Sequence, residues 1–160
     1  MAQPNFIGRS ISLLSRRTRR YFDLVLAPYQ IGCGQQLFLL IVYQKPGISM
    51  YDLAKTAQFD KGTATRAAQK LEEAGYLRIE TDPRDKRVRR LYATEAARAV
   101  ADSIYAARQR WERVLAEGLT PEEAAAAARL LEKLAQNAEN SINQEEQAFG
   151  ANTKPTDGEH

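Results

Sequence analysis

Apolar side chains recur at helical spacing in two stretches near the start of the chain. Residues 6–26 predict an amphipathic helix, with arginines to either side of its apolar face. That face consists of Ile7, Ile11, Leu14, Tyr21 and Val25. Residues 35–44 are apolar nearly all round, which predicts a buried second helix that ends before Pro46.

Two shorter helical patterns follow, each opened by a residue suited to cap a helix. Ser49 is the expected N-cap of a helix whose inner side is Leu53, Ala54 and Ala57. Asp60 is the expected cap of the next helix, about residues 61–74, which Gly75 closes. The inner face of this fourth helix is predicted to be Ala64, Ala67, Ala68 and Leu71.

The pattern then changes from helical spacing to alternation. Residues 77–81 alternate apolar and polar as a half-buried strand does, and residues 89–93 pair back across a turn, giving a two-stranded hairpin. Thr94 is the expected cap of a long helix that ends at Gly118. Thr120 begins a last helix that fades near Gln147.

Composition excludes several classes of protein. The 160 residues carry a net charge of +3, but residues 1–94 hold 16 basic and 8 acidic side chains, whereas residues 95–160 hold 7 and 12. The only histidine is His160, and no phosphate-loop or nucleophile-elbow motif is present, so the sequence favours neither an enzyme nor a metal or cofactor site. The single Cys33 and the lack of a signal or membrane-spanning stretch predict a cytoplasmic protein.

The order of elements is that of a winged helix-turn-helix domain, in which the fourth helix fits the DNA major groove and the hairpin is the wing. The first turns of the helix offer polar or small residues to base edges and phosphates: Lys61, Gly62, Thr63, Thr65, Arg66, Gln69 and Lys70. Basic residues at the hairpin tip suit a narrow minor groove: Arg84, Lys86, Arg87 and Arg89. The alternative is that this charged loop is only a solvated surface.

Residues 60–77 and the wing pattern Asp82-x-Arg84-Asp85-x-Arg87, with Leu91 and Thr94, resemble the MarR family of bacterial transcriptional regulators. The resemblance implies a homodimer that binds a palindromic operator, with DNA affinity lowered by a small ligand or by oxidation. It implies that Thr63, Thr65 and Arg66 face the major groove and that Arg84 or Arg87 enters the minor groove. Asp82 is then expected to orient a wing arginine.

The fold class is therefore expected to be mainly α with a small β-hairpin. Its winged domain, residues 31–94, is flanked by dimerisation helices in residues 1–30 and 95–147 and followed by a disordered tail, 148–160. The expected dimer contacts are Phe6, Ile7, Ile11, Leu14, Leu130, Leu131 and Leu134. The alternative for these apolar rows is that they close a monomeric core.

The resemblance places a ligand pocket between the dimerisation helices and the winged domain. Candidates for an anionic aromatic ligand there are Arg17, Tyr21, Tyr43, Tyr105 and Trp111. Two other functions stay open. One is a redox sensor that uses Cys33, although the peroxide-sensing branch of the family carries its reactive cysteine near the start of the first helix and Cys33 follows that helix. The other is a winged-helix module that binds proteins instead of DNA.

Overall fold

The structure, a computed structural model, describes residues 6–152, and side-chain burial through residue 149. The chain divides into two compact units, the first ending at Trp111 and the second beginning at Glu112. The first unit contains the predicted winged domain together with the helix before it and most of the helix after it. The predicted domain boundary at residue 94 therefore lies inside this unit.

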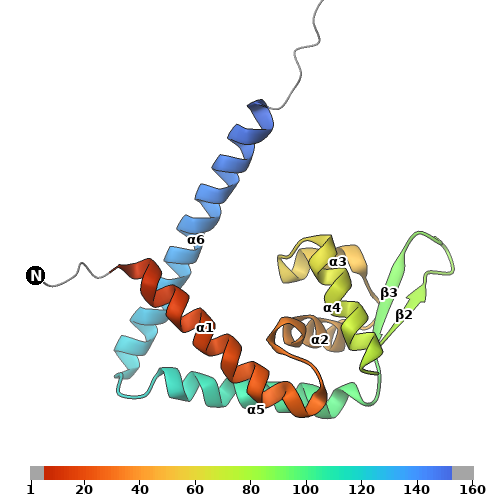
Figure 1. Ribbon diagram of the computed structural model, residues 1–160, viewed down its shortest axis with the longest axis horizontal. Coiled ribbons are helices and arrows are strands. Elements are labelled where there is room, and N and C mark those ends of the chain that lie inside the picture. The colour runs from red at the N-terminus through yellow and green to blue at the C-terminus, as the bar shows by residue number, and fades with distance from the viewer. Residues whose placement is uncertain (1–5, 153–160) are drawn as a thin grey trace, which may run out of the picture. The chain divides into compact units, whose positions relative to one another are not determined.

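The elements follow the predicted order, with a one-turn 3₁₀ helix and a short strand added (Figure 1). The helices are α1 Ile7–Leu26, α2 Cys33–Gln44, α3 Met50–Ala57, α4 Lys61–Glu73, α5 Ala97–Leu115 and α6 Pro121–Asn152, and the 3₁₀ turn is Ala27–Tyr29. The strands are β1 Ile48–Ser49, β2 Leu77–Thr81 and β3 Arg89–Ala93.

Local capping sets the ends of the helix-turn-helix. The Ser49 hydroxyl accepts the Asp52 N–H at 3.0 Å, and an Asp60 carboxylate oxygen accepts the Thr63 N–H at 2.9 Å. Both bonds satisfy amides that the first turn of a helix leaves without a backbone partner, so both predicted caps are confirmed. Gln58 ends α3 in the left-handed region at φ 57°, and this turns the chain toward α4.

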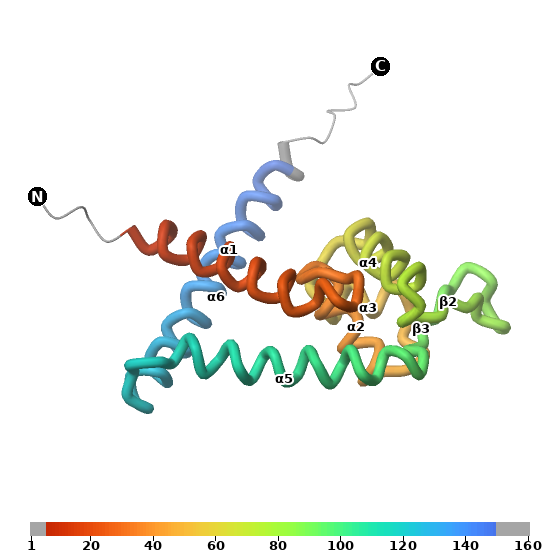
Figure 2. Tube along the Cα trace, turned by 60° about the horizontal axis from the view of Figure 1, so that its bottom comes forward, coloured from red at the N-terminus to blue at the C-terminus, as the bar shows by residue number. Residues whose placement is uncertain are grey.

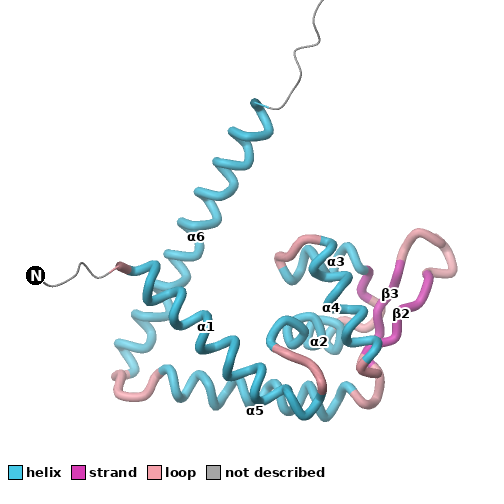
Figure 3. Tube along the Cα trace, viewed as in Figure 1, coloured by secondary structure: helices cyan, strands magenta, loops and turns pink. Residues whose placement is uncertain are grey.

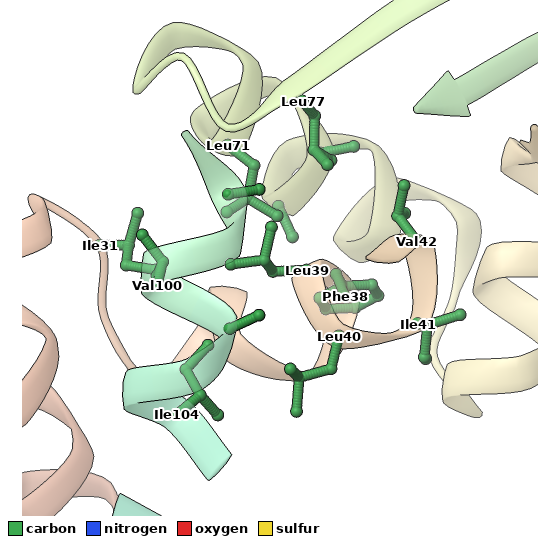
Figure 4. Packing of buried hydrophobic residues seen from close by; sticks show 14 of the residues in the cluster. Ile31, Phe38, Leu39, Leu40, Ile41, Val42, Leu71, Leu77, Val100 and Ile104 are labelled. Carbon is green, nitrogen blue, oxygen red and sulfur yellow. The ribbon is translucent and has the colours of Figure 1, made fainter. Parts of the chain in front are cut away.

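The hydrophobic core of the first unit surrounds α2, as Figure 4 shows. Phe38, Leu39 and Val42 of α2 are almost completely buried. The predicted inner faces of α3 and α4 are all buried as well, and Val100 and Ile104 bring α5 into the same cluster. Apolar burial is the main favourable term in folding, so α2 holds the helix-turn-helix in place from behind.

The sheet has three strands instead of the two that the sequence predicted. β2 and β3 form the predicted antiparallel hairpin, with Ile79 opposite Leu91, and β1 adds to the other edge of β3, so that the order is β1-β3-β2. Leu91 is fully buried at the centre of this sheet. Figure 3 shows the strands in magenta, with the wing loop projecting beyond them.

Thr94 does not cap α5 as predicted, because the helix begins at Ala97. Its hydroxyl donates instead to the Gly75 carbonyl at 2.7 Å, and its N–H donates to the Tyr76 carbonyl at 3.0 Å. These two bonds tie the base of the wing to the end of α4, where Gly75 stands at φ 82°.

The second unit is dominated by α6. Thr120 and Glu123 exchange hydrogen bonds between side chain and backbone, a capping box that confirms the predicted helix start at Thr120. The helix continues to Asn152, five residues beyond the predicted end, so residues 148–152 are helical and not a disordered tail. The rest of the predicted tail, 153–160, lies outside the described residues.

Within residues 6–152, no single helix is both long and apolar enough to cross a bilayer. One bent pair, Ile7–Tyr29 with Cys33–Gln44, reaches that length and apolarity only when its parts are combined across a bend of 68°.

Candidate DNA-binding surface

The solvent-facing side of α4 contains the residues that the sequence assigned to the major groove. Lys61, Gly62, Arg66, Gln69 and Lys70 are exposed, and Thr63 and Thr65 are half-buried. Figure 2 shows α4 beside the hairpin, so these residues and the wing belong to neighbouring elements. The inner face of α4 consists of three alanines and one leucine. The small alanine side chains let the helix lie close to the core while its polar side faces solvent.

The first turn of α4 is organised by Asp60. One carboxylate oxygen accepts the Thr63 N–H, and the other accepts the Thr63 hydroxyl at 2.6 Å. Arg66 Nη2 donates to the same Thr63 oxygen at 3.2 Å. The Thr63 hydroxyl and amide, with the Arg66 charge nearby, lower the pKa of Asp60, so the carboxylate is ionised at neutral pH.

Thr65 differs from Thr63 although both were predicted to face DNA. Its hydroxyl donates to the Lys61 carbonyl at 2.7 Å, one turn back along the same helix. Thr65 is thus tied to the backbone of α4, and Thr63 to the cap and to Arg66.

The wing is organised by a second aspartate, Asp82, whose exposed fraction is only 8%. Its Oδ1 accepts the Arg84 N–H at 2.7 Å and the Asp85 N–H at 3.3 Å, while Oδ2 accepts Arg90 Nε at 2.5 Å. The Arg90 guanidinium and these amides lower the pKa of Asp82. Around this carboxylate the predicted wing residues Arg84, Lys86, Arg87 and Arg89 are all exposed.

Arg90 has a role that the sequence analysis did not assign. Besides binding Asp82, its Nη1 donates to the Gly47 carbonyl at 3.0 Å, in the loop before α3. The Asp82 carboxylate raises the pKa of Arg90 further above its usual range. Its partners lie 8 and 43 residues away, so no local pattern could have identified it.

A groove of about 420 Å³ lies between α4, the start of α3 and the wing. Several predicted contact residues from both elements line it together: Lys61, Thr65, Gln69, Arg87 and Arg89. Arg66 and Lys70 instead line a second cavity of about 560 Å³, beside the start of α2. The predicted recognition residues therefore divide between the two sides of α4.

Three of the five residues predicted for a ligand pocket, Tyr21, Tyr105 and Trp111, have hydrogen-bond or ring partners inside the first unit. Tyr21 and Trp111 stack with ring centroids 4.5 Å apart, and Trp111 Nε1 donates to Thr18. The Tyr21 hydroxyl donates to the Ala107 carbonyl, and the Tyr105 hydroxyl accepts from Gln44. Tyr43 is half-buried against the core and Arg17 is exposed on α1. Their role in ligand binding stays a prediction.

Cys33 is the first residue of α2 and is half-buried. Its N–H donates to Asp23 Oδ1 at 2.7 Å, and its sulfur accepts from Gln36 Nε2 at 3.4 Å. These contacts describe a cysteine that helps to fix the start of a helix, and they do not test the redox alternative.

The residues predicted for a dimer interface form exposed apolar rows on α1 and α6. Phe6 and Ile7 are 74% and 58% exposed, and Leu130 is 50% exposed. Ile11, Leu14 and Leu131 are also exposed, and Leu134 is half-buried. Removing apolar side chains of this size from water lowers the free energy, so these rows suit contacts with another chain.

A family model described as "MarR family" matches residues 34–88. The chain is similar to the uncharacterized HTH-type transcriptional regulator YybA of Bacillus subtilis, with 29% identity over 84% of this chain and 90% of the relative.

The chain is also similar to solved structures of MarR proteins. A MarR protein from Peptoclostridium difficile is 31% identical over 90% of this chain and 96% of its own, with a TM-score of 0.80. A cysteine-to-serine mutant of MarR from E. coli, complexed with operator DNA, is 26% identical over 80% of this chain and 92% of its own, with a TM-score of 0.71.

Proposed function

Because the chain belongs to the MarR family of DNA-binding transcriptional regulators, we propose that it represses transcription by binding a palindromic operator as a homodimer. The observation that carries this proposal is the combination of an exposed polar face on α4 with a basic wing held in order by Asp82. The family consists of transcriptional regulators and not of enzymes.

In this function α4 enters the major groove and the wing reaches the adjacent minor groove. Arg66 reads base edges near the start of α4, and Thr65 and Gln69 lie along the groove between α4 and the wing. Arg84 and Arg87 project from the exposed wing tip toward phosphates or the minor-groove floor. The relative from E. coli that was solved with operator DNA supports this mode of binding.

Dimerisation is the second part of the proposal. A palindromic operator presents two equivalent half-sites, so a two-fold dimer matches its symmetry. The exposed rows that contain Phe6, Ile11 and Leu130 supply the apolar surface that such a dimer buries.

Ligand release is the third part, and we place the ligand in the cavity beside the start of α2. Among the described residues, Gln36 Oε1 is a buried acceptor without a partner, and Gln36 is only 7% exposed. The cavity also contains Phe38 and Phe59, with four cations: Arg19, Arg66, Lys70 and Arg108. A hydroxylated aromatic acid fits this set, since its hydroxyl donates to Gln36 and its carboxylate meets the cations.

Because Arg66 lines that cavity, a bound anion competes with DNA for the same guanidinium. The ligand would then lower operator affinity without any change in the wing.

The test is an anisotropy titration of the full chain on a palindromic duplex from near its own gene. Wild type should bind in the nanomolar range with a steep salt dependence, and salicylate, used as the probe acid, should weaken binding. Arg66→Ala should relax base preference at one pair by about 1–3 kcal/mol, whereas Arg84→Ala should weaken all sequences evenly and flatten the salt slope.

Sequence-independent binding by wild type, or binding that is absent at low salt, would overturn the regulator proposal. Equal loss of base preference in Arg66→Ala and Arg84→Ala would contradict the division of roles between helix and wing.

A further inference from the structure

The start of α4 contains a chain of hydrogen bonds that goes beyond capping. Asp60 accepts the Thr63 hydroxyl at 2.6 Å, and Thr63 accepts Arg66 Nη2 at 3.2 Å. We call Asp60, Thr63 and Arg66 the cap triad. All its contacts join residues three positions apart, so they lie along one side of the first turn.

The chemistry of the hydroxyl fixes the direction of these bonds. A threonine hydroxyl has one proton, and an ionised carboxylate can only accept, so the Thr63 proton is committed to Asp60. The Thr63 oxygen is then left with lone pairs alone, and it accepts from Arg66. Thr63 therefore presents an acceptor to Arg66 and has no proton left to donate to a base or phosphate.

The absence of a side chain at Gly62 leaves space for the Arg66 guanidinium and the Asp60 carboxylate. A Cβ atom at this position would lie 3.4 Å from Arg66 Nη1 and 3.1 Å from Asp60 Oδ1. The distance to the Asp60 oxygen is the tight one, whereas 3.4 Å from Arg66 Nη1 is close to an ordinary van der Waals contact. Nη1 of Arg66 thus lies near the Gly62 position, while Nη2 donates to Thr63.

We infer that Thr63 and Gly62 are positioning residues that hold the Arg66 guanidinium along the first turn of α4, so that it reads a guanine in the operator. The inference rests on the proposed function, in which α4 enters the major groove. A guanidinium held at one Nη2 hydrogen still offers a two-pronged edge, and that edge matches guanine O6 and N7. Holding the side chain before binding also removes part of the entropy cost of ordering it on DNA.

The experiment first selects an operator for the full-length wild-type chain from a pool of duplexes randomised around a palindrome. Variants are then titrated on the selected duplex and on duplexes in which each guanine pair is replaced in turn. The quantity measured is the ratio of Kd values for replaced and original duplexes, together with the Tm of each free variant.

Wild type should discriminate at one guanine by about 5- to 150-fold, as a bidentate arginine–guanine pair does, and Arg66→Ala should abolish this ratio. Thr63→Val should lower the ratio at the same guanine by at least about fivefold, and Thr63→Ser should restore it. The double variant Thr63→Val with Arg66→Ala should lose no more at that guanine than Arg66→Ala alone.

Two further variants separate positioning from mere stability. Gly62→Ala keeps every hydrogen-bonding group but places a methyl group 3.1 Å from Asp60 Oδ1, so the cap triad must shift and discrimination at the same guanine should fall. Thr65→Val is the matched control, because its hydroxyl is bound to the Lys61 carbonyl and not to Arg66. Its loss should add to that of Arg66→Ala.

Additive losses for Thr63→Val and Arg66→Ala, or full guanine discrimination in Gly62→Ala, would overturn the positioning role while leaving the proposed function intact. Failure of the wild-type chain to select any sequence would overturn both.

Discussion

The start of α4 and the wing are each organised by an aspartate of their own, yet the contacts of the two aspartates span different distances along the chain. Asp60 is exposed, and its contacts reach only three residues along the same helix. Asp82 is buried and joins the amides of its own turn to Arg90 on the opposite strand. Arg90 in turn reaches the Gly47 carbonyl, 43 residues away. The start of α4 is thus stabilised by residues of the same helix and its cap, whereas the wing depends on contacts within the folded sheet.

The largest effect is expected from Asp82→Ala, which removes the acceptor for two wing amides and for Arg90 at once. The wing loop should lose its fixed shape, and DNA affinity should fall by about 10- to 100-fold, the equivalent of one to two lost base or phosphate contacts. Anisotropy on the selected operator measures this loss.

Asp85→Ala is the control for the wing, since the side chain of Asp85 is an exposed acceptor whose partner is Arg87 in the same loop. Its affinity should stay within about threefold of wild type, because exposed ion pairs contribute little. If the two alanine variants lose affinity equally, Asp82 has no special place in the wing.

A smaller effect is expected at the helix. Asp60→Ala removes the N-cap of α4 and should lower Tm by about 2–4 °C at fixed protein concentration. Asp60→Ser keeps a cap for the Thr63 amide, so its Tm should match wild type. It cannot also hold the Thr63 hydroxyl as the second carboxylate oxygen does, so guanine discrimination should fall. A Tm loss in Asp60→Ser as large as in Asp60→Ala would contradict a purely local cap.

The smallest effect is expected from pH. The pKa of Asp60 and that of Asp82 are both lowered from the ordinary value of 3.8. A lowered folded-state pKa gives stability that is complete above 3.8 and is lost as pH falls through the lower folded value. Stability should therefore be insensitive to these groups at neutral pH.

The measurement for pH is an NMR titration of the Thr63 and Arg84 amides, which report on Asp60 and Asp82. Both midpoints should lie below 3.8. A midpoint at or above that value for either amide would show that its aspartate is not held in the ionised form by these bonds.

The sequence predicted the features that depend on neighbouring residues. The Ser49 and Asp60 caps, the inner face of α4 and the pairing of the two hairpin strands all follow from spacing within one turn or one strand pair. β1 escaped prediction because two residues have no period to detect. Thr94 was misassigned because its hydroxyl binds the Gly75 carbonyl, a partner 19 residues away, instead of opening a helix.

The candidate site likewise has features that the sequence predicted and features that it did not. The identity of the exposed residues on α4 and the wing could be predicted from sequence, but their partners could not. That Thr63 binds the cap while Thr65 binds the backbone depends on side-chain rotamers. That Arg90 binds Asp82 depends on which face of β3 turns toward the loop.

The bond from Arg90 to Gly47 fastens the wing to the loop that leads into α3. In the proposed function, the wing that reaches the minor groove is therefore tied to the helix-turn-helix that supplies the major-groove helix, and this restricts how far the two can separate. A DNA-binding surface restricted in this way adapts little to a stiff or unusually spaced duplex. The duplex itself must then deform for both elements to bind. Operator positions that no side chain touches would then be selected for how easily they bend.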